Sequence, residues 1–396
     1  MINETTGFWG RPAWAEIDLD AIAHNVRVLK QHVGERTQVM AVVKANAYGH
    51  GAEAVARMAL ASGASWLGVS LVDEGVQLRR AGLPGPILVL GHCPPWEAAK
   101  AVDSALTPTV TTLESALAVA EAASQRRKVI PVHLKVDTGM GRYGLLVDEV
   151  VPFARQVAGM ATLRLEGLWT HFASADEADK GPTWQQFQAF QATLAKLEEN
   201  GIAVPIRHVA NSAATLDLPE THLDVVRCGI SIYGLYPSPE VSHALALRPA
   251  MSLKARIVRV RSLPAGTRVG YGRTWEAQGP CRVALVPLGY ADGCRRSLSN
   301  RGTVRVGGER APVIGRVSMD QITLDVSDIP GVQQYDEAVL VGRQGQGEIS
   351  ADEVACLLDT INYEVVAALA ARVPRVYLKG GQVVAYETLV SGYEER

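Results

Sequence analysis

The chain has 396 residues, 47% of them hydrophobic and 20% charged, which is enough for two domains with a large core. A formal net charge of -2 excludes a basic surface for nucleic acid or an anionic membrane, and no apolar run is long enough to span a bilayer. The amino terminus lacks a signal-peptide pattern, and five scattered cysteines without CxxC spacing indicate the reduced, buried thiols of a cytoplasmic protein and no zinc site (Cys93, Cys228, Cys281, Cys294 and Cys356).

The first helix is expected over residues 17–33, where apolar residues recur at steps of three and four. Asp18 or Asp20 can cap its start, and Gly34 ends it. After it, eight short apolar runs alternate with helical patterns. The runs cover residues 38–44, 66–70, 86–90, 107–111, 129–136, 163–170, 206–210 and 225–228, and the helices between them include residues 52–61, 73–81, 113–123, 147–158 and 184–199.

This alternation predicts an α/β fold, and eight strands favour a closed (β/α)8 barrel, the TIM-barrel architecture. An open doubly wound sheet stays possible, because the number of strands does not show whether a sheet closes. After residue 244 the pattern changes to strand-like runs between glycine and proline turns: 252–260, 281–287, 303–306, 313–317, 321–326, 338–341 and 375–378, with one helical stretch at 350–371. We therefore expect two domains, a barrel over residues 1–245 and a mostly-β domain over residues 246–396.

Lys44 ends the first apolar run of the predicted barrel. The carboxyl ends of the strands carry the active site in barrel enzymes, and a lysine that leaves an apolar strand is placed for a lowered pKa and a nucleophilic amine. On its own, a lysine at a strand end is more often solvated. Polar residues also follow four other runs: Arg142 after the fifth, His171 after the sixth, Asn211 and Ser212 after the seventh, and Arg227, Gly229 and Ile230 at the end of the eighth.

Together these residues suit an anionic, aromatic cofactor. The glycine-rich loop around Arg142 offers a planar guanidinium that can bind a carboxylate. The Gly229 and Ile230 amides could point at a phosphate, because phosphate sites recur after the last two strands of barrel enzymes. Taken singly, His171 is more often a structural hydrogen-bonding residue and Ser212 more often a helix cap. Their combination at neighbouring strand ends indicates a site.

The stretch VVKANAYGHG, residues 42–51, resembles the pyridoxal-phosphate attachment signature of the alanine racemases and departs from it nowhere. The resemblance covers nearly the whole chain. It runs through RPAWAEIDLDAIAHN (11–25), DTGMGR (137–142), VGYGRTW (269–275), PLGYADG (287–293), GRVSMDQ (315–321) and INYEVVAALAARVPRVY (361–377). Matches in one order at family-like spacing are highly specific. They imply an amino-terminal (β/α)8 barrel, a carboxy-terminal β domain and a head-to-tail homodimer with shared active sites.

The resemblance also implies roles for single residues. Lys44 would anchor pyridoxal phosphate and then exchange the substrate's α-proton on one face, while Tyr271 from the partner subunit would serve the other face. Arg227 would face the pyridine nitrogen and keep it unprotonated, because arginine does not give up its proton, which limits transamination. The remaining cofactor-binding residues would be Tyr48, His171, Asn211, Ser212, Gly229, Ile230 and Tyr363. The substrate-binding residues would be Arg142 and Met319 at the carboxylate, Tyr290 and Asp320 at the entrance, and Lys135, which carbamylation would turn into an anion that orients Arg142.

The implied activity is that of a cytoplasmic, homodimeric isomerase that interconverts L-alanine and D-alanine and supplies D-alanine for peptidoglycan. Two alternatives of related chemistry are a racemase of broader specificity and a decarboxylase on the same barrel-plus-β plan. A third is a non-catalytic pyridoxal-phosphate-binding barrel. Decarboxylases of this kind lack the VGYGRTW and GRVSMDQ motifs, and the non-catalytic barrels end before the β domain.

Overall fold

The computed structural model describes residues 10–396, which divide into two compact units. The barrel unit comprises residues 21–47 and 55–249, and the β unit comprises residues 10–20, 48–54 and 250–396. The units are therefore not continuous in sequence, in contrast to the predicted division into 1–245 and 246–396. The prediction that the chain starts without a signal peptide concerns mainly residues 1–9, which lie outside the described residues.

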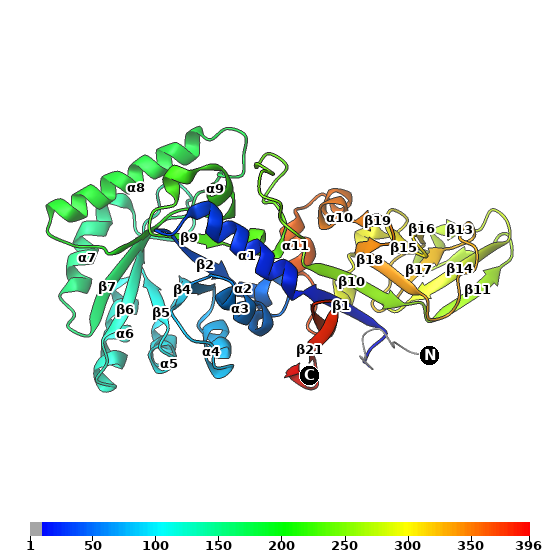
Figure 1. Ribbon diagram of the computed structural model, residues 1–396, viewed down its shortest axis with the longest axis horizontal. Coiled ribbons are helices and arrows are strands. Elements are labelled where there is room, and N and C mark those ends of the chain that lie inside the picture. The colour runs from blue at the N-terminus through cyan, green and yellow to red at the C-terminus, as the bar shows by residue number, and fades with distance from the viewer. Residues whose placement is uncertain (1–9) are drawn as a thin grey trace. The chain divides into compact units, whose positions relative to one another are not determined.

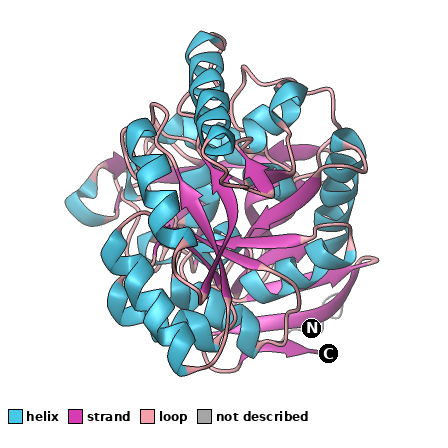
Figure 2. Cartoon of the chain, turned by 90° about the vertical axis from the view of Figure 1, so that its left-hand side faces the viewer, coloured by secondary structure: helices cyan, strands magenta, loops and turns pink. Residues whose placement is uncertain are grey.

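Eight parallel strands form the barrel unit, and helices surround them (Figures 1 and 2). The strands are β2 (Gln38–Val42), β3 (Trp66–Val69), β4 (Ile87–His92), β5 (Thr107–Val110), β6 (Ile130–Lys135), β7 (Leu163–Trp169), β8 (Ile206–His208) and β9 (Val225–Cys228). Each pairs with the next from β2 to β8, and β2 also pairs with β9. Backbone bonds from Arg227 N to Ala210 O, 3.0 Å, and from Asp224 N to Arg207 O, 3.1 Å, join the two remaining edges. The sheet closes, which confirms the predicted barrel and excludes the open sheet.

The helices alternate with these strands, as the sequence predicts. They are α1 (Leu19–Val33), α2 (Lys44–Tyr48), α3 (Ala52–Ala61), α4 (Val72–Arg80), α5 (Ala98–Asp103), α6 (Leu113–Gln125), α7 (Val150–Ala158), α8 (Gly181–Glu199) and α9 (Ser212–Asp217), with 3-10 helices η1 (Pro95–Glu97), η2 (Val147–Glu149), η3 (Pro219–Thr221) and η4 (Ile230–Tyr233). Residues 10–396 contain no helix with the length and apolar composition needed to cross a membrane.

The predicted start of the first helix at Ile17 is wrong. Ile17 and Asp18 end strand β1 (Ala13–Asp18), which the sequence reading missed, and Ile17 pairs with Met251 on one side and with Tyr377 on the other. The helix begins at Leu19, where the Asp18 carboxylate accepts a hydrogen bond from the Asp20 amide at 2.9 Å. Asp18 is therefore the residue that caps the helix, and its end before Gly34 is as predicted.

The barrel interior is filled by large apolar side chains from several strands. Met40, Trp66, Leu88 and Val225 are buried together, with Leu90 and Ile206 against them. The Trp66 ring lies 5.5 Å from the ring of His133 on β6, so this apolar layer passes directly into a polar one. The carboxyl ends of the strands are therefore supported by a packed core rather than a pore.

The β unit contains one continuous sheet within the described residues (Figure 1). Its strands are β1 with β10 (Met251–Arg256), β11 (Arg259–Leu263), β14 (Cys281–Val286), β15 (Thr303–Val306), β16 (Glu309–Ile314), β17 (Ile322–Asp325), β18 (Glu337–Gln344), β19 (Gly347–Ile349), β20 (Arg375–Lys379), β21 (Gln382–Thr388) and β22 (Gly392–Glu395). A separate hairpin joins β12 (Arg268–Val269) and β13 (Trp275–Glu276). The helices are α10 (Ala351–Leu358), α11 (Asn362–Ala367) and the 3-10 helices η5 (Tyr271–Arg273), η6 (Tyr290–Asp292) and η7 (Arg296–Leu298).

The mostly-β character of this part of the chain is confirmed, but two segments are divided where the sequence reading kept them whole. The run 252–260 forms two strands, β10 and β11, which pair with different neighbours. The helical stretch 350–371 breaks at Asp359, which adopts a left-handed φ of 54° and so ends α10.

All five cysteines are free. Cys93, Cys228 and Cys294 are buried, as predicted, whereas Cys281 is half-buried and Cys356 is exposed. The prediction of buried thiols therefore holds for three of the five.

Candidate active site

The predicted polar residues of the barrel converge around His171, just after β7. Burial lowers the pKa of the His171 imidazole well below its ordinary value, and the nearby cations Arg227, Arg142, Lys135 and Lys44 lower it further. Nη2 of Arg227 lies 3.3 Å from Nδ1 of His171, and the parallel pairs β2–β9 and β6–β7 end at the same edge of the barrel. The ends of β2, β6, β7 and β9 therefore meet there. The result is a cationic mouth at the carboxyl end of the barrel, suited to an anionic ligand.

Lys44 comes two residues after the end of β2, at the start of an unusual backbone turn. Ala45, Asn46, Ala47 and Tyr48 all have φ between 51° and 53°, so they form one left-handed turn. Each non-glycine residue in this conformation costs about 1–2 kcal/mol, so surrounding contacts must hold it. Burial and then the Arg142 charge lower the pKa of Lys44, while Glu74 opposes them. A lowered pKa leaves more of the amine neutral and nucleophilic.

Arg227 is held rigidly in the barrel interior, with 3% of its surface exposed. Nη1 donates to the backbone oxygen of His208 at 3.0 Å and approaches its ring Nδ1 at 3.1 Å, and Nη2 donates to the oxygens of Thr170 at 2.8 Å and Val209 at 2.9 Å. Nη2 also lies 3.3 Å from Nδ1 of His171. Burial lowers the pKa of Arg227, but the guanidinium remains a cation near neutral pH. The fifth donor, Nε–H, is not used in these bonds.

Two buried histidines continue this network behind Arg227. Arginine only donates, so Nδ1 of His208 must accept, which leaves its Nε2–H to donate to Nδ1 of His133 at 2.9 Å. Nε2–H of His133 then faces the Glu166 carboxylate at 3.4 Å. Burial lowers the pKa of both imidazoles, so both stay neutral. A Cβ on Gly167 would lie 2.6 Å from the His133 ring, so this glycine makes room for the network.

Ser212 and Asn211 lie at the start of α9, after β8. Ser212 Oγ accepts the Gly229 amide at 2.9 Å and bonds the Ser231 hydroxyl at 3.0 Å. Asn211 caps the helix, because its Oδ1 accepts the Ala214 amide at 3.0 Å. Ile230 begins η4, so its amide has no acceptor within that helix. A serine hydroxyl and backbone amides thus gather between the last two strands, where the sequence predicts a phosphate site.

The loop after β6 is organised by Asp137. One carboxylate oxygen accepts the amides of Gly139, Met140 and Gly141 at 2.8–3.1 Å, and the other accepts the Arg142 amide at 3.0 Å. These four hydrogen bonds fix the backbone that carries Arg142, whose side chain is exposed.

Lys135 lies below this loop and is only 2% exposed. Its Nζ donates to the backbone oxygen of Tyr143 at 2.6 Å and lies 5.0 Å from the centre of the Trp169 ring. Burial, followed by the charge of Arg142, lowers the pKa of Lys135 to about 8. This amine is therefore partly neutral near physiological pH.

In the β unit, three of the predicted residues share adjoining loops. The amide of Tyr290 donates to Ser318 O at 3.0 Å, and the next amide along, that of Ala291, donates to Met319 O at 3.0 Å. Asp320 forms an ion pair with Arg372 at 2.5 Å. The turn that carries Tyr271 packs on the same loop, because a Cβ on Gly270 would lie 2.9 Å from Arg316 N.

Tyr271, Tyr290 and Met319 are exposed to 71%, 42% and 52%, which is unusual for large apolar side chains. Ile361 of the β unit is also exposed, to 59%. An exposed group of this kind marks a surface that contacts another molecule.

Tyr48 and Tyr363 also lie together in the β unit, with ring centres 6.1 Å apart. Burial raises the pKa of Tyr48 to about 12, so its hydroxyl keeps its proton and acts as a donor. Such a donor suits a phosphate oxygen.

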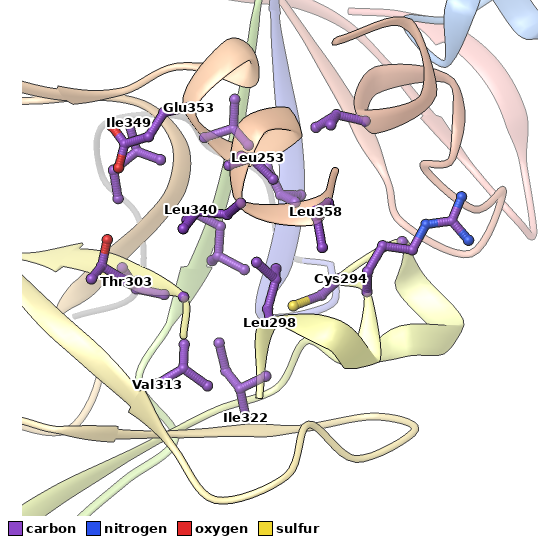
Figure 3. Close-up of a pocket in the computed structure, with 18 of the residues that line it drawn as sticks. Leu253, Cys294, Leu298, Thr303, Val313, Ile322, Leu340, Ile349, Glu353 and Leu358 are labelled. Atoms are coloured by element: carbon purple, nitrogen blue, oxygen red, sulfur yellow. The ribbon is translucent and has the colours of Figure 1, made fainter. Parts of the chain in front are cut away.

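Figure 3 shows an apolar pocket of the β unit that is partly open to solvent. Aliphatic side chains line it, among them Leu253, Leu298, Ile322, Leu340 and Leu358. None of the predicted site residues is in its lining. The pocket is therefore separate from the polar groups described above.

The sequence reading missed several residues of the barrel site. His133 and His208 are polar residues inside otherwise apolar runs, and Glu166 interrupts another run in the same way. Buried polar residues need hydrogen-bond partners, so these polar residues within apolar runs could have indicated a buried hydrogen-bond network. A second signal was Asp137, which begins the glycine-rich loop DTGMGRYG.

Two family models match the chain: the N-terminal domain of alanine racemase over residues 17–237 and the C-terminal domain of alanine racemase over residues 250–377. A curated relative, an alanine racemase from Desulfosudis oleivorans, is 49% identical in an alignment of 380 residues that covers 93% of this chain and 97% of that protein. The solved alanine racemase of Clostridium difficile 630 has a TM-score of 0.93 at 37% identity and covers 97% of this chain and 100% of its own. The alanine racemase from Bacillus anthracis with bound L-Ala-P has a TM-score of 0.92 at 38% identity, with 96% and 99% covered.

Proposed function

This chain belongs to the alanine racemase family, and we propose that it is a pyridoxal-phosphate-dependent isomerase that interconverts L-alanine and D-alanine, with D-alanine going to peptidoglycan. The observation that supports this most directly is the convergence of Lys44, Lys135, Arg142 and Arg227 around His171. A half-buried amine with a lowered pKa, in the same site as a rigid guanidinium, fits a reaction on the amino group of an anionic substrate.

The residues present fit pyridoxal phosphate. Lys44 offers the amine that would hold its carbonyl carbon. Arg227 has Nε–H left to donate to a pyridine nitrogen, and Ser212 with the Gly229 and Ile230 amides would hold the phosphate. The proposed set is completed by Tyr48, Tyr363, His171 and Asn211.

When bound, pyridoxal phosphate withdraws electrons from the substrate's α-carbon and makes the α-proton acidic. Lys44 then takes or returns this proton on one face of the α-carbon, and Tyr271 of a second copy does so on the other. Arg142 and the Met319 amide hold the substrate carboxylate, and Tyr290 and Asp320 line the entrance. Arg227 cannot transfer a proton to the ring nitrogen, so the proton returns to the α-carbon and transamination stays rare.

A homodimer with shared sites is part of this proposal. The exposed side chains of Tyr271, Tyr290 and Met319, which lie on adjoining loops, support it, because such a surface is suited to a second chain. The five free cysteines favour a reducing compartment such as the cytoplasm.

The test is to incubate the purified protein, loaded with pyridoxal phosphate, with each L-amino acid in heavy water. We expect loss of optical rotation together with α-deuteration for alanine alone. Exchange and racemisation across many amino acids would indicate a broad-specificity racemase, and release of carbon dioxide would indicate a decarboxylase. No reaction with any amino acid would favour a non-catalytic barrel and overturn the proposal.

The lowered pKa of Lys135 predicts a pH dependence of stability. Between about pH 8 and the ordinary value of 10.5, the unfolded chain binds a proton at this lysine and the folded chain does not. The penalty of the buried cation is therefore fully present below about pH 8 and is relieved as the pH rises. In carbon-dioxide-free buffer, the free energy of unfolding should rise with pH over this range more steeply in the unsubstituted protein than in Lys135→Met. The free energy of unfolding is measured by urea titration at each pH. If it rises equally steeply with pH in both proteins, the lowered pKa is not that of Lys135.

The neutral amine is also the form that reacts with carbon dioxide. We therefore propose that carbon dioxide, in equilibrium with added bicarbonate, bonds through its carbon to the neutral Lys135 nitrogen, which releases one proton to solvent and becomes a carbamate. Intact-mass measurement at low temperature would detect this adduct, and Lys135→Met would abolish it. The carbamate anion would then face Arg142, whose charge acts on Lys135.

A further inference from the structure

We propose that Glu74 is a positioning residue for Lys44: its carboxylate clamps the left-handed turn that follows Lys44 to the first turn of α4. This inference rests on the proposed role of Lys44 and deepens it. Glu74 does not touch the substrate or the cofactor in this proposal; it acts through the backbone next to Lys44.

The two oxygens of Glu74 bind different segments. Oε1 accepts the amide of Ala45 at 2.7 Å, the residue directly after Lys44. Oε2 accepts the amides of Ser70 at 2.7 Å and Leu71 at 3.1 Å, at the end of β3 and the start of α4. One carboxylate thus joins the carboxyl ends of two adjacent barrel strands, β2 and β3.

The turn needs such support because its conformation is unfavourable for its residues. Ala45, Asn46 and Ala47 all have positive φ, a conformation that is unfavourable for residues other than glycine. Within the turn, the Ala47 amide donates to Val43 O at 2.9 Å. The bond to Glu74 is charge-assisted and holds the first left-handed residue, so it sets the direction in which the chain leaves Lys44.

Only an ionised carboxylate satisfies all three amides. It accepts at both oxygens and donates at neither. A glutamine would keep one acceptor oxygen but would turn an NH₂ group toward at least one backbone amide. The three hydrogen bonds therefore require the ionised carboxylate of Glu74. The shorter aspartate would preserve the charge but would not reach both segments.

The Glu74 charge also acts on the Lys44 amine. The charged or titratable groups of the barrel unit that face this amine are Arg142, Glu74 and His171. Burial and Arg142 lower the pKa of Lys44, and Glu74 alone among these raises it. Neutralising Glu74 should therefore move the pKa of Lys44 further down, whereas a residue that only supports the fold would leave it unchanged.

The test compares Glu74→Gln and Glu74→Asp with a matched control, Asp73→Asn. Asp73 is the preceding residue of α4, has a 71% exposed side chain and pairs with Lys100 at 2.7 Å, so its substitution removes the same charge without reaching the turn. The first readout is the reactivity of Lys44 toward an amine-specific acetylating reagent as a function of pH, measured by peptide mass spectrometry on the cofactor-free protein. The second is the rate at which added pyridoxal phosphate produces the visible absorption of its lysine adduct.

We expect the apparent pKa of Lys44 to fall in Glu74→Gln, to stay close to its normal value in Glu74→Asp and not to move in Asp73→Asn. When rates are compared at equal fractions of neutral Lys44 amine, taken from the acetylation profiles, capture of pyridoxal phosphate should slow by at least about tenfold in Glu74→Gln, as expected from loss of a hydrogen bond to a charged group, and by less in Glu74→Asp. Far-UV circular dichroism must show that each variant is folded. If Glu74→Gln does not fold, the test compares the capture rates of Glu74→Asp and Asp73→Asn.

An unchanged Lys44 pKa together with an unchanged capture rate in Glu74→Gln would overturn the inference. Failure of the proposed function looks different. If the unsubstituted protein does not capture pyridoxal phosphate at Lys44, the proposed function fails, while the acetylation profiles still report whether Glu74 controls the amine.

Discussion

Replacing Lys44 with alanine should abolish racemisation, and replacing Tyr271 with phenylalanine should nearly do so, yet a mixture of the two inactive proteins should recover activity. Acid–base groups contribute about 10²–10⁴-fold each, and in the proposed mechanism Lys44 also anchors the cofactor, so we expect losses of at least about 10⁴-fold and about 10³-fold. In a mixed dimer, one site would combine Lys44 from one chain with Tyr271 from the other. Free exchange of subunits would give up to about a quarter of the normal activity, because half of the dimers carry one complete site.

Two controls make this result specific. Tyr335→Phe removes the hydroxyl of another exposed tyrosine of the β unit and should leave the activity intact. The double variant Lys44→Ala/Tyr271→Phe, mixed with Lys44→Ala, has no Lys44 to contribute and should stay inactive. If subunit exchange is demonstrated by mass-tagged chains and the mixture still shows no activity, Tyr271 does not serve the site of another chain.

The barrel was predictable because its strands are buried on both faces and so appear as short, nearly continuous apolar runs. All eight runs correspond to strands of the closed sheet. β1 was not predictable in the same way, since its apolar residues continue without a break into those of α1. Ile17 pairs with Met251 and Tyr377, which are both far from it in the sequence, and no local pattern reveals such pairing.

The site could be predicted as a set of strand ends but not as a network. Lys44, Arg142, His171 and Arg227 stand out because each follows an apolar run, and the structure brings them together. Glu74 lies within a helix and reaches a different strand end, so its sequence position says nothing about Ala45. The left-handed turn could not be predicted either, because a sequence of alanine and asparagine does not indicate four consecutive residues with positive φ.

The network around Arg227 predicts that even lysine cannot replace it. Lysine has three donors on one atom, whereas Arg227 presents four donors to separate acceptors, among them the buried oxygens of Thr170, Val209 and His208. At least one buried acceptor would lose its partner, so we expect Arg227→Lys to lower the free energy of unfolding by about 2–4 kcal/mol. Arg207→Lys, on the neighbouring strand β8, is the matched control. Its side chain is 45% exposed and pairs with Asp224, so the same substitution there should change stability by at most about 0.5 kcal/mol.

Arg227→Lys should also reduce the fidelity of the reaction. A buried ammonium can lower its pKa and transfer a proton, which arginine cannot do, so a ring nitrogen facing lysine can become protonated and draw electrons more strongly. A larger fraction of turnovers should then end in pyruvate, the product of transaminating alanine, relative to racemisation. Urea unfolding of the cofactor-free protein and a lactate-dehydrogenase assay for pyruvate measure the two effects separately. A variant that is as stable as the Arg207→Lys control and forms no additional pyruvate would show that the buried guanidinium has neither function.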